Sequence, residues 1–186
     1  MPRRPPVSLS LALAVVALVA AAACGGSGSA SPTPTTAALV TTVPVATTQS
    51  PIDGVQTFAV VAAHADGPIS YPQIPPVGGT HNPVWVPCTF YDKPVQNEMA
   101  VHSLEHGAIW LTWRADLPPA DVAALAALAR SRKDIVASPW ADDTLPSPLV
   151  ATAWGRQLRL QSTSDPRLAQ FVALYAGQGP ERGAPC

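Results

Sequence analysis

Beyond residue 53, short apolar runs and longer amphipathic stretches alternate along the chain. Runs rich in β-branched and aromatic residues are typical of strands, whereas apolar residues spaced three and four apart indicate helices. This pattern predicts strands over residues 57–63, 108–113 and 135–138, and a hairpin of residues 149–154 and 157–160 around Gly155-Arg156. It predicts helices over residues 96–106, from Pro118-Pro119 to residues 130–133, and from Asp165-Pro166 to Gly177. We therefore expect an α+β fold, with a small mixed or antiparallel sheet and two or three helices.

Residues 68–87 interrupt this pattern. The segment is rich in Pro and contains the pair Gly78-Gly79, and these residue types break both helices and strands. Long loops are usually either functional or disordered. The aromatic residues Tyr71 and Trp85 and the nearby Cys88 can anchor this one, so we expect a long ordered Pro/Gly loop.

The first 23 residues have the pattern of a secretory signal peptide. Arg3 and Arg4 precede an apolar run over residues 9–23 that ends in small residues. Cys24 follows Ala21, Ala22 and Ala23 and precedes Gly25, which is similar to a bacterial lipobox, where the cysteine receives lipid. Diacyl attachment holds a protein stably on a membrane. We expect an exported protein anchored through Cys24 to the outer face of the bacterial cell membrane. The alternative is an ordinary signal peptide in which Cys24 is incidental.

The segment after Cys24 is uncharged up to Asp53 and consists mainly of Gly, Ser, Thr, Pro, Ala and Val. Such a composition cannot bury a core, so residues 24–53 are predicted to form a disordered linker. Residues 54–186 then have the length of a single globular domain. Without residues 1–23 the chain has nine basic and twelve acidic residues, a net charge of −3. This balance argues against a nucleic-acid partner, and the sequence indicates no particular protein partner.

The three cysteines are Cys24, Cys88 and Cys186. If Cys24 carries lipid, the other two are left to pair, and an oxidising compartment favours a disulfide between Cys88 and Cys186. The alternative is that one of these two cysteines is a metal ligand.

All four histidines lie between residues 64 and 106. His102 and His106 are four residues apart, which places both imidazoles on one face of a helix. His81 follows Gly78-Gly79 and can approach as a third ligand. Met99 or Glu98, one helical turn before His102, can complete the ligand shell. Imidazole suits several transition metals; a thioether favours Cu(I) and a carboxylate favours Zn²⁺. We therefore expect a copper or zinc site and no organic cofactor.

Two other interpretations remain open. The string His102-x-x-Glu105-His106 matches an inverted zinc-protease motif, in which Glu105 would be the general base of a metal-dependent hydrolase. Alternatively, the histidines are buried and hydrogen-bonded, and the domain is a structural or interaction module.

Several of these residues together resemble a known family. Tyr71-Pro-x-x-Pro-Pro-x-Gly-Gly-x-His81, then Tyr91, then the run Val101-His-Ser-Leu-Glu-His-Gly-Ala-Ile109, are similar to the DUF3105 family of uncharacterised bacterial domains. The family also tends to have a histidine at the position of His64, and it usually has Ser at the position of Gly78. The resemblance covers roughly residues 55–177. It implies that the family signature runs through the histidines, so His64 joins the candidate ligands, and it implies no activity.

Overall fold

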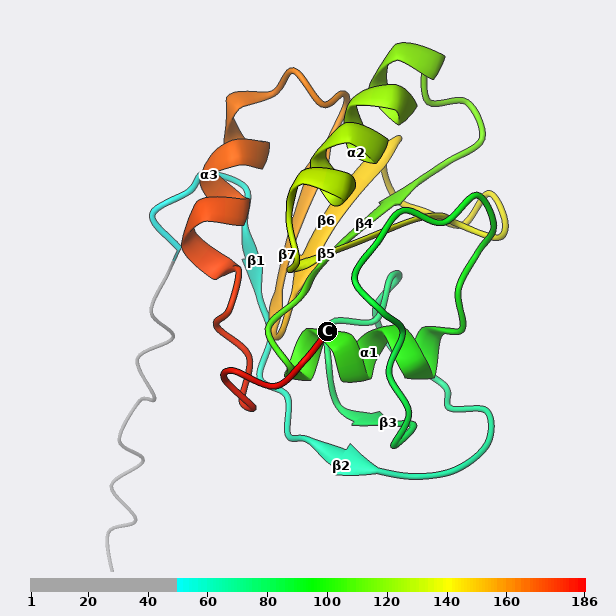
Figure 1. The fold of residues 1–186 in the computed structure, drawn as a ribbon, viewed down its shortest axis with the longest axis vertical. Coiled ribbons are helices and arrows are strands. Elements are labelled where there is room, and N and C mark those ends of the chain that lie inside the picture. The colour runs from blue at the N-terminus through cyan, green and yellow to red at the C-terminus, as the bar shows by residue number, and fades with distance from the viewer. Residues whose placement is uncertain (1–49) are drawn as a thin grey trace, which may run out of the picture. The chain divides into compact units, whose positions relative to one another are not determined.

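A computed structural model describes residues 50–186, which form an α+β fold and so confirm the predicted fold class (Figure 1). The helices are α1 (Asn97–Glu105), α2 (Pro119–Ser131) and α3 (Pro166–Tyr175). The strands are β1 (Gln56–Thr57), β2 (Ala63–His64), β3 (Thr80–His81), β4 (Ile109–Trp113), β5 (Ile135–Pro139), β6 (Leu149–Ala153) and β7 (Arg156–Leu160).

The described strands form a mixed five-stranded sheet in the order β1-β7-β6-β4-β5 and a separate pair, β2-β3. In the large sheet only β4 and β5 are parallel, and α2 provides the crossover that a parallel pair requires. Strands β6 and β7 form the predicted hairpin, with Gly155 at a φ of +65° in its turn.

The helices cover both faces of this sheet. Ile109, Leu111 and Trp113 of β4 lie in a main core with residues of α2 and α3, whereas Trp110 lies in a second core with α1. Successive side chains of a strand point to opposite faces, so α2 and α3 cover one face and α1 the other. Figure 1 shows α1 at the lower end of the sheet, next to β2, β3 and the C-terminus. The candidate site lies in this lower region.

Helix α1 follows the predicted bounds because its end is specified locally. Gly107 has a φ of +97°, a left-handed conformation that glycine adopts without strain. Its N–H donates to the Leu104 carbonyl, and the N–H of Ala108 donates to the Ser103 carbonyl. This hydrogen-bond pattern is a Schellman motif, which ends helices at a glycine.

The predicted strand over residues 57–63 was wrong. Only Gln56 and Thr57 pair with β7, and the chain then leaves the sheet before Ala63 and His64 pair with β3. Val61 is 84% exposed, so the apolar run does not supply the sheet with a buried strand. The long Pro/Gly loop is ordered as expected: Pro75 and Val77 are buried, and their carbonyls accept hydrogen bonds from Gln157 and Gly155.

The start of the domain lies earlier than the linker prediction places it. Ile52 is buried in the main core, and the hydroxyl of Tyr175 donates a hydrogen bond to Ser50. The predicted signal peptide, Cys24 and the predicted linker up to residue 49 lie outside the described residues. Within residues 50–186, no helix has the length and apolar character needed to cross a membrane.

Candidate metal site

The C-terminal half of α1 places polar side chains in a buried position. His102, Ser103, Glu105 and His106 are each less than a tenth exposed. The hydroxyl of Ser103 donates to the Val86 carbonyl and accepts from the Val86 N–H, which attaches the long loop to the helix. His102 and Glu105 are three residues apart, so they lie on the same face of α1.

The small pair of strands supplies two more histidines. Strands β2 and β3 are parallel, and their register places His64 directly opposite His81. Neighbouring strands are about 4.8 Å apart, so partners in register hold their side chains next to each other. The rings of His64 and His81 have centroids 4.7 Å apart. His81 is fully buried, whereas the side chain of His64 is 48% exposed.

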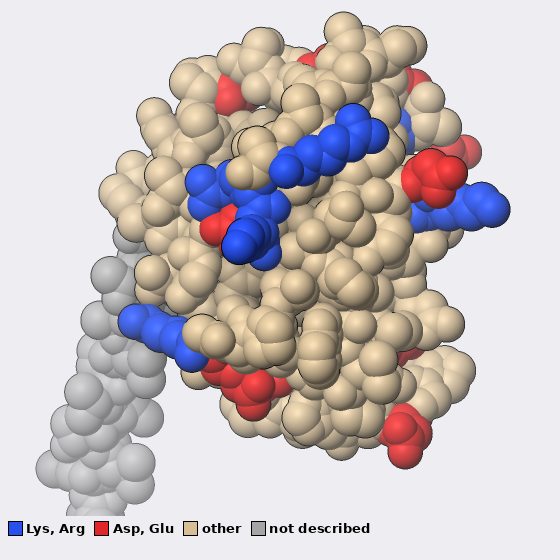
Figure 2. All heavy atoms as spheres, viewed as in Figure 1, with Lys and Arg blue, Asp and Glu red and all other residues tan. Residues whose placement is uncertain are grey.

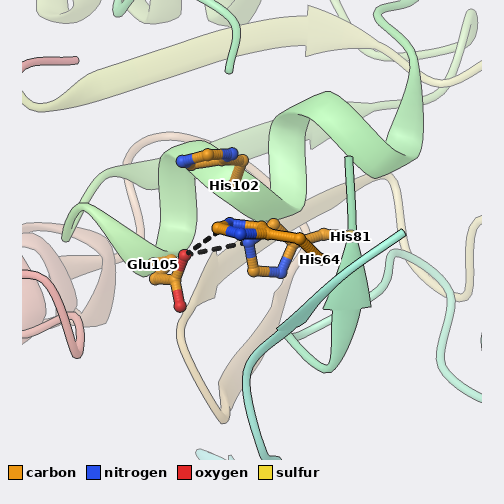
Figure 3. Close-up of side chains that lie close together, drawn as sticks. All are labelled: His64, His81, His102 and Glu105. Atoms are coloured by element: carbon orange, nitrogen blue, oxygen red, sulfur yellow. Dashed lines mark hydrogen bonds and ion pairs between the residues drawn. The ribbon is translucent and has the colours of Figure 1, made fainter. Parts of the chain in front are cut away.

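Three elements therefore bring four side chains together: His64 from β2, His81 from β3, and His102 and Glu105 from α1 (Figure 3). We call these the primary group. One ligand atom from each lies within 4.8 Å of all the others. The Nε2 atoms of His81 and His64 lie 2.9 and 3.6 Å from Oε2 of Glu105. Ligand atoms around a tetrahedral Zn²⁺ are about 3.4 Å apart, so the group can close on an ion by small side-chain movements.

The other ring nitrogen of the buried histidines is already bonded. Nδ1 of His81 lies 2.8 Å from the Gly79 carbonyl, and Nδ1 of His102 lies 2.7 Å from the Asn82 carbonyl. A carbonyl only accepts, so each Nδ1 carries the proton and each Nε2 keeps its lone pair when the ring is neutral. This is how proteins fix the tautomer and orientation of metal-binding histidines.

Burial lowers the pKa of the His102 imidazole from its ordinary value, although the hydrogen bond to the Asn82 carbonyl opposes the shift. The neighbouring His106 and His81 lower this pKa further, and Glu105 raises it. A lowered pKa favours the neutral ring, which is the form that binds a metal.

His106, which the sequence places beside His102 as a core ligand, belongs to a second group. Its Nε2 lies 3.4 Å from Oε2 of Glu181, and these two residues and His102 again hold ligand atoms within 4.8 Å of one another. We call His102, His106 and Glu181 the tail group, because Glu181 lies in the C-terminal tail, residues 177–186. Nδ1 of His106 lies 2.5 Å from the Pro185 carbonyl, so the tail also fixes this ring.

The two residues expected to complete the shell are not brought into either group. The carboxylate of Glu98 accepts a hydrogen bond from the Ile69 N–H at 2.9 Å. Met99 packs against the second core. Glu105, expected only as a general base, lies among the ligand atoms instead. The donors are therefore imidazole nitrogens and carboxylate oxygens, which suit Zn²⁺ or Cu²⁺ better than the soft Cu(I) ion.

Cys88 and Cys186 are joined in a disulfide, with Cα atoms 5.1 Å apart. Neither sulfur is then available to bind a metal, and the bond holds the end of the tail against the long loop. The cysteine count in the sequence predicts this pairing.

The sequence did not reveal that the short strands β2 and β3 pair with each other. The apolar run before His64 predicts a strand over residues 57–63, the Pro/Gly segment places His81 in a loop, and two-residue strands carry no periodicity that would indicate their partner. The family resemblance was the only signal that drew attention to His64. Glu181 carried no signal, because it lies in the tail, 76 residues after Glu105 in the chain.

The face shown in Figure 2 carries most of its basic side chains in the upper half and few in the lower half, where α1, β2 and β3 lie.

A family model described as "Protein of unknown function (DUF3105)" matches residues 63–186, a segment that contains every member of both groups. No curated protein and no solved structure matches the chain.

Proposed function

This chain belongs to the DUF3105 family of proteins of unknown function, and we propose that its domain binds one divalent transition-metal ion, zinc or copper, outside the cytoplasm. The primary group holds the ion, and lipid on Cys24 keeps the domain on the outer face of the bacterial cell membrane. The observation that carries the proposal is the convergence of three imidazoles and one carboxylate, in which the two buried histidines have Nδ1 at a backbone carbonyl.

The hydrogen bonds of these rings bear on the choice between a metal site and a structural module. A purely structural role needs the imidazoles only to satisfy nearby polar groups, and the Nδ1 atoms do this. It also accounts for the hydrogen bond of 2.9 Å between Nε2 of His81 and Oε2 of Glu105, but it gives no reason for His64 and His102 to approach the same two side chains. Bringing buried polar groups together without a ligand to satisfy them costs free energy, whereas a bound cation satisfies several at once. The convergence therefore supports the metal hypothesis.

The N-terminal sequence pattern and the disulfide support the proposed location outside the cytoplasm. A positive start, an apolar run and a cysteine after small residues are typical of an exported lipoprotein. Disulfides persist in oxidising compartments, which agrees with the pair Cys88–Cys186. In cells that carry Cys24→Ser, we expect the protein to move from the membrane fraction to the soluble extracytoplasmic fraction. If the variant still sediments with membranes to the wild-type extent, the lipid anchor is ruled out.

The metal hypothesis is tested by equilibrium dialysis of the purified protein against Zn²⁺ and, separately, Cu²⁺. The wild type should retain about one equivalent, as expected for one four-donor site. The double variant His81→Asn/His102→Asn should retain none at the same free metal concentration. The amide of Asn takes the place of Nδ1, so the bonds to the Gly79 and Asn82 carbonyls are kept while both Nε2 ligands are removed. Circular dichroism checks that the variant is folded, and equally low retention by both proteins would refute the proposal.

A metal-dependent hydrolase is the second candidate. The observation in its favour is that the three imidazoles can act as ligands by themselves, with Glu105 next to them and the half-exposed His64 open to water. Catalytic zinc sites have three protein ligands and a water in the fourth position. In Glu105→Gln, retained metal with lost turnover of a peptide or ester substrate would favour the hydrolase. Loss of the metal itself would identify Glu105 as a ligand and favour the binding protein.

A further inference from the structure

The tail group shares one ligand with the primary group. Nδ1 of His102 is bonded to the Asn82 carbonyl, so Nε2 is the nitrogen that His102 can offer to either set of partners. We propose that the tail group is a second metal site, at which an incoming divalent ion docks before it passes through His102 to the primary group. This inference rests on the proposed metal-binding function and adds the route by which the ion enters and leaves.

Because both sites use the same nitrogen of His102, only one of them can be occupied at a time. A neutral imidazole nitrogen has a single lone pair, and it binds one ion at a time. The two groups therefore do not form a two-metal centre; they are two positions for a single ion. His106 and Glu181 complete the first position, and His64, His81 and Glu105 complete the second.

The two positions differ in the number of donors and in the chemistry of the exposed donor. The tail group has three donors, and its exposed member is the carboxylate of Glu181, which is 50% exposed. The primary group has four donors; its exposed member is the imidazole of His64, which is 48% exposed, and the side chains of His81 and Glu105 are 0% and 5% exposed. An exposed carboxylate attracts cations from solution, while a set with more donors, most of them buried, binds them more tightly because the attraction is less screened by water. The ion therefore arrives at the tail group and comes to rest in the primary group.

The rings lie close enough for the ion to move without leaving the protein. The ring centroid of His102 is 4.5 Å from that of His106 and 4.9 Å from that of His81. An ion that stays on His102 can exchange His106 and Glu181 for His81 and Glu105, one ligand at a time. Trp85, which is 37% exposed, has its ring centroid 5.1 Å from that of His106 and 5.7 Å from that of His102, so its ring lies beside this path.

Stopped-flow transfer of Zn²⁺ from a chromophoric chelator to the full-length mature protein tests this route. The variants are Glu181→Gln, which removes an exposed charge, and His106→Asn, whose amide keeps a donor for the Pro185 carbonyl. Asp143→Asn, an exposed loop carboxylate in neither group, is the charge-matched control. We expect Glu181→Gln to load about tenfold or more slowly, as for loss of electrostatic steering, and His106→Asn to load more slowly because a docking ligand is removed. Both should also release the ion to excess chelator more slowly, because the same route is used in both directions. Their final occupancy should match that of the wild type, and the control should load at the wild-type rate.

A third variant isolates the tail group. With His64→Asn/His81→Asn the protein should still bind about one equivalent of Zn²⁺, but weakly, and adding His106→Asn should abolish that binding. Wild-type loading rates in both Glu181→Gln and His106→Asn would show that the ion enters past His64, and the proposal would be wrong. Binding of two equivalents by the wild type would overturn it as well. Failure of the wild type to bind any Zn²⁺ or Cu²⁺ is a distinct result, because it refutes the metal-binding function itself.

Discussion

The two nitrogens of each buried imidazole in the primary group face different partners. In His81 and His102, Nδ1 faces a carbonyl of the long loop, and Nε2 faces the other members of the primary group. The sequence shows that imidazoles are present and lie near each other in the chain, but it does not show which nitrogen is free. That depends on where the carbonyls of Gly79 and Asn82 point, and this is a property of the folded loop.

At this scale, His81→Asn and His81→Gln should lose different hydrogen bonds. The amide of Asn replaces Nδ1 and keeps the bond to Gly79 but not the one to Glu105, while the amide of Gln reaches the position of Nε2 and loses the bond to Gly79. Neither amide nitrogen has a lone pair for a metal, so both variants should lower Zn²⁺ affinity strongly, by calorimetric titration. In the absence of metal, each should also lower the free energy of unfolding by about 1 kcal/mol for the hydrogen bond lost. Wild-type stability of His81→Gln would contradict the role given to Gly79.

Among the elements, the pair β2-β3 matters most for the site, although each strand has two residues. Its register places His64 against His81, and the N–H of Ala65 donates to the His81 carbonyl at 2.8 Å within this pairing. A contact outside the ladder also holds it: the hydroxyl of Tyr71 donates to the Thr80 carbonyl at 2.8 Å. Short strands of this kind depend on the loop around them for their position.

Tyr71→Phe should therefore loosen β3 without unfolding the domain. Removal of a residue that orients a ligand typically costs about 10- to 100-fold in metal affinity, and we expect a loss near the lower end. Calorimetric titration with Zn²⁺ measures the effect, and Tyr91→Phe, whose hydroxyl bonds the Pro87 carbonyl instead, is the matched control. Identical affinities for both variants and the wild type would show that Tyr71 does not position the site.

The same tyrosine predicts how stability depends on pH. Burial, with a smaller effect of Glu98, raises the pKa of Tyr71 to about 12, from 10.0. The unfolded chain then loses this proton more readily than the folded chain, so the stabilisation is present below pH 10 and declines as pH rises from 10 toward 12. Urea unfolding of the wild type across this range should show the decline, and Tyr71→Phe should show a smaller one.

For the whole molecule, the tail is the segment that connects distant parts of the chain. Its Gly177 N–H donates to the Gly107 carbonyl, its Glu181 N–H donates to the Glu105 carbonyl, and the disulfide ties Cys186 to Cys88. Close approach of the backbones requires glycine, since a Cβ on Gly179 would overlap with the Glu105 carbonyl. The tail thus holds the C-terminal end of α1 from outside.

Removing the disulfide with Cys88→Ala/Cys186→Ala should lower the stability of the domain without changing its equilibrium affinity for metal. The two cysteines are 98 residues apart, so in the chain-entropy model the bond contributes about 4–5 kcal/mol to the free energy of unfolding. Chemical denaturation measures this loss. At a temperature where the variant is folded, its equilibrium affinity for Zn²⁺ should stay close to wild type, since no member of the primary group lies in the tail. A loss of affinity as large as that of His81→Asn would show that the tail shapes the primary group directly.

The sequence by itself determined the local features of this protein. Glycines fixed where α1 and α3 end and Pro166 where α3 begins, the apolar periods indicated the sheet and its covering helices, and the cysteine count indicated the disulfide. It also showed that all four histidines lie between residues 64 and 106. These inferences succeed because they rest on interactions between residues close in the chain, or on composition.

Tertiary structure decided which of these residues meet. On α1, Met99 and Glu98 are spaced from His102 as suitably as Glu105 is, and helical periodicity cannot choose among them. Packing of Met99 on the second core and bonding of Glu98 to Ile69 leave Glu105 to face His81. The pairing of β2 with β3 and the return of Glu181 to His106 are contacts between distant segments, made by burial and backbone hydrogen bonds that the whole domain has to provide.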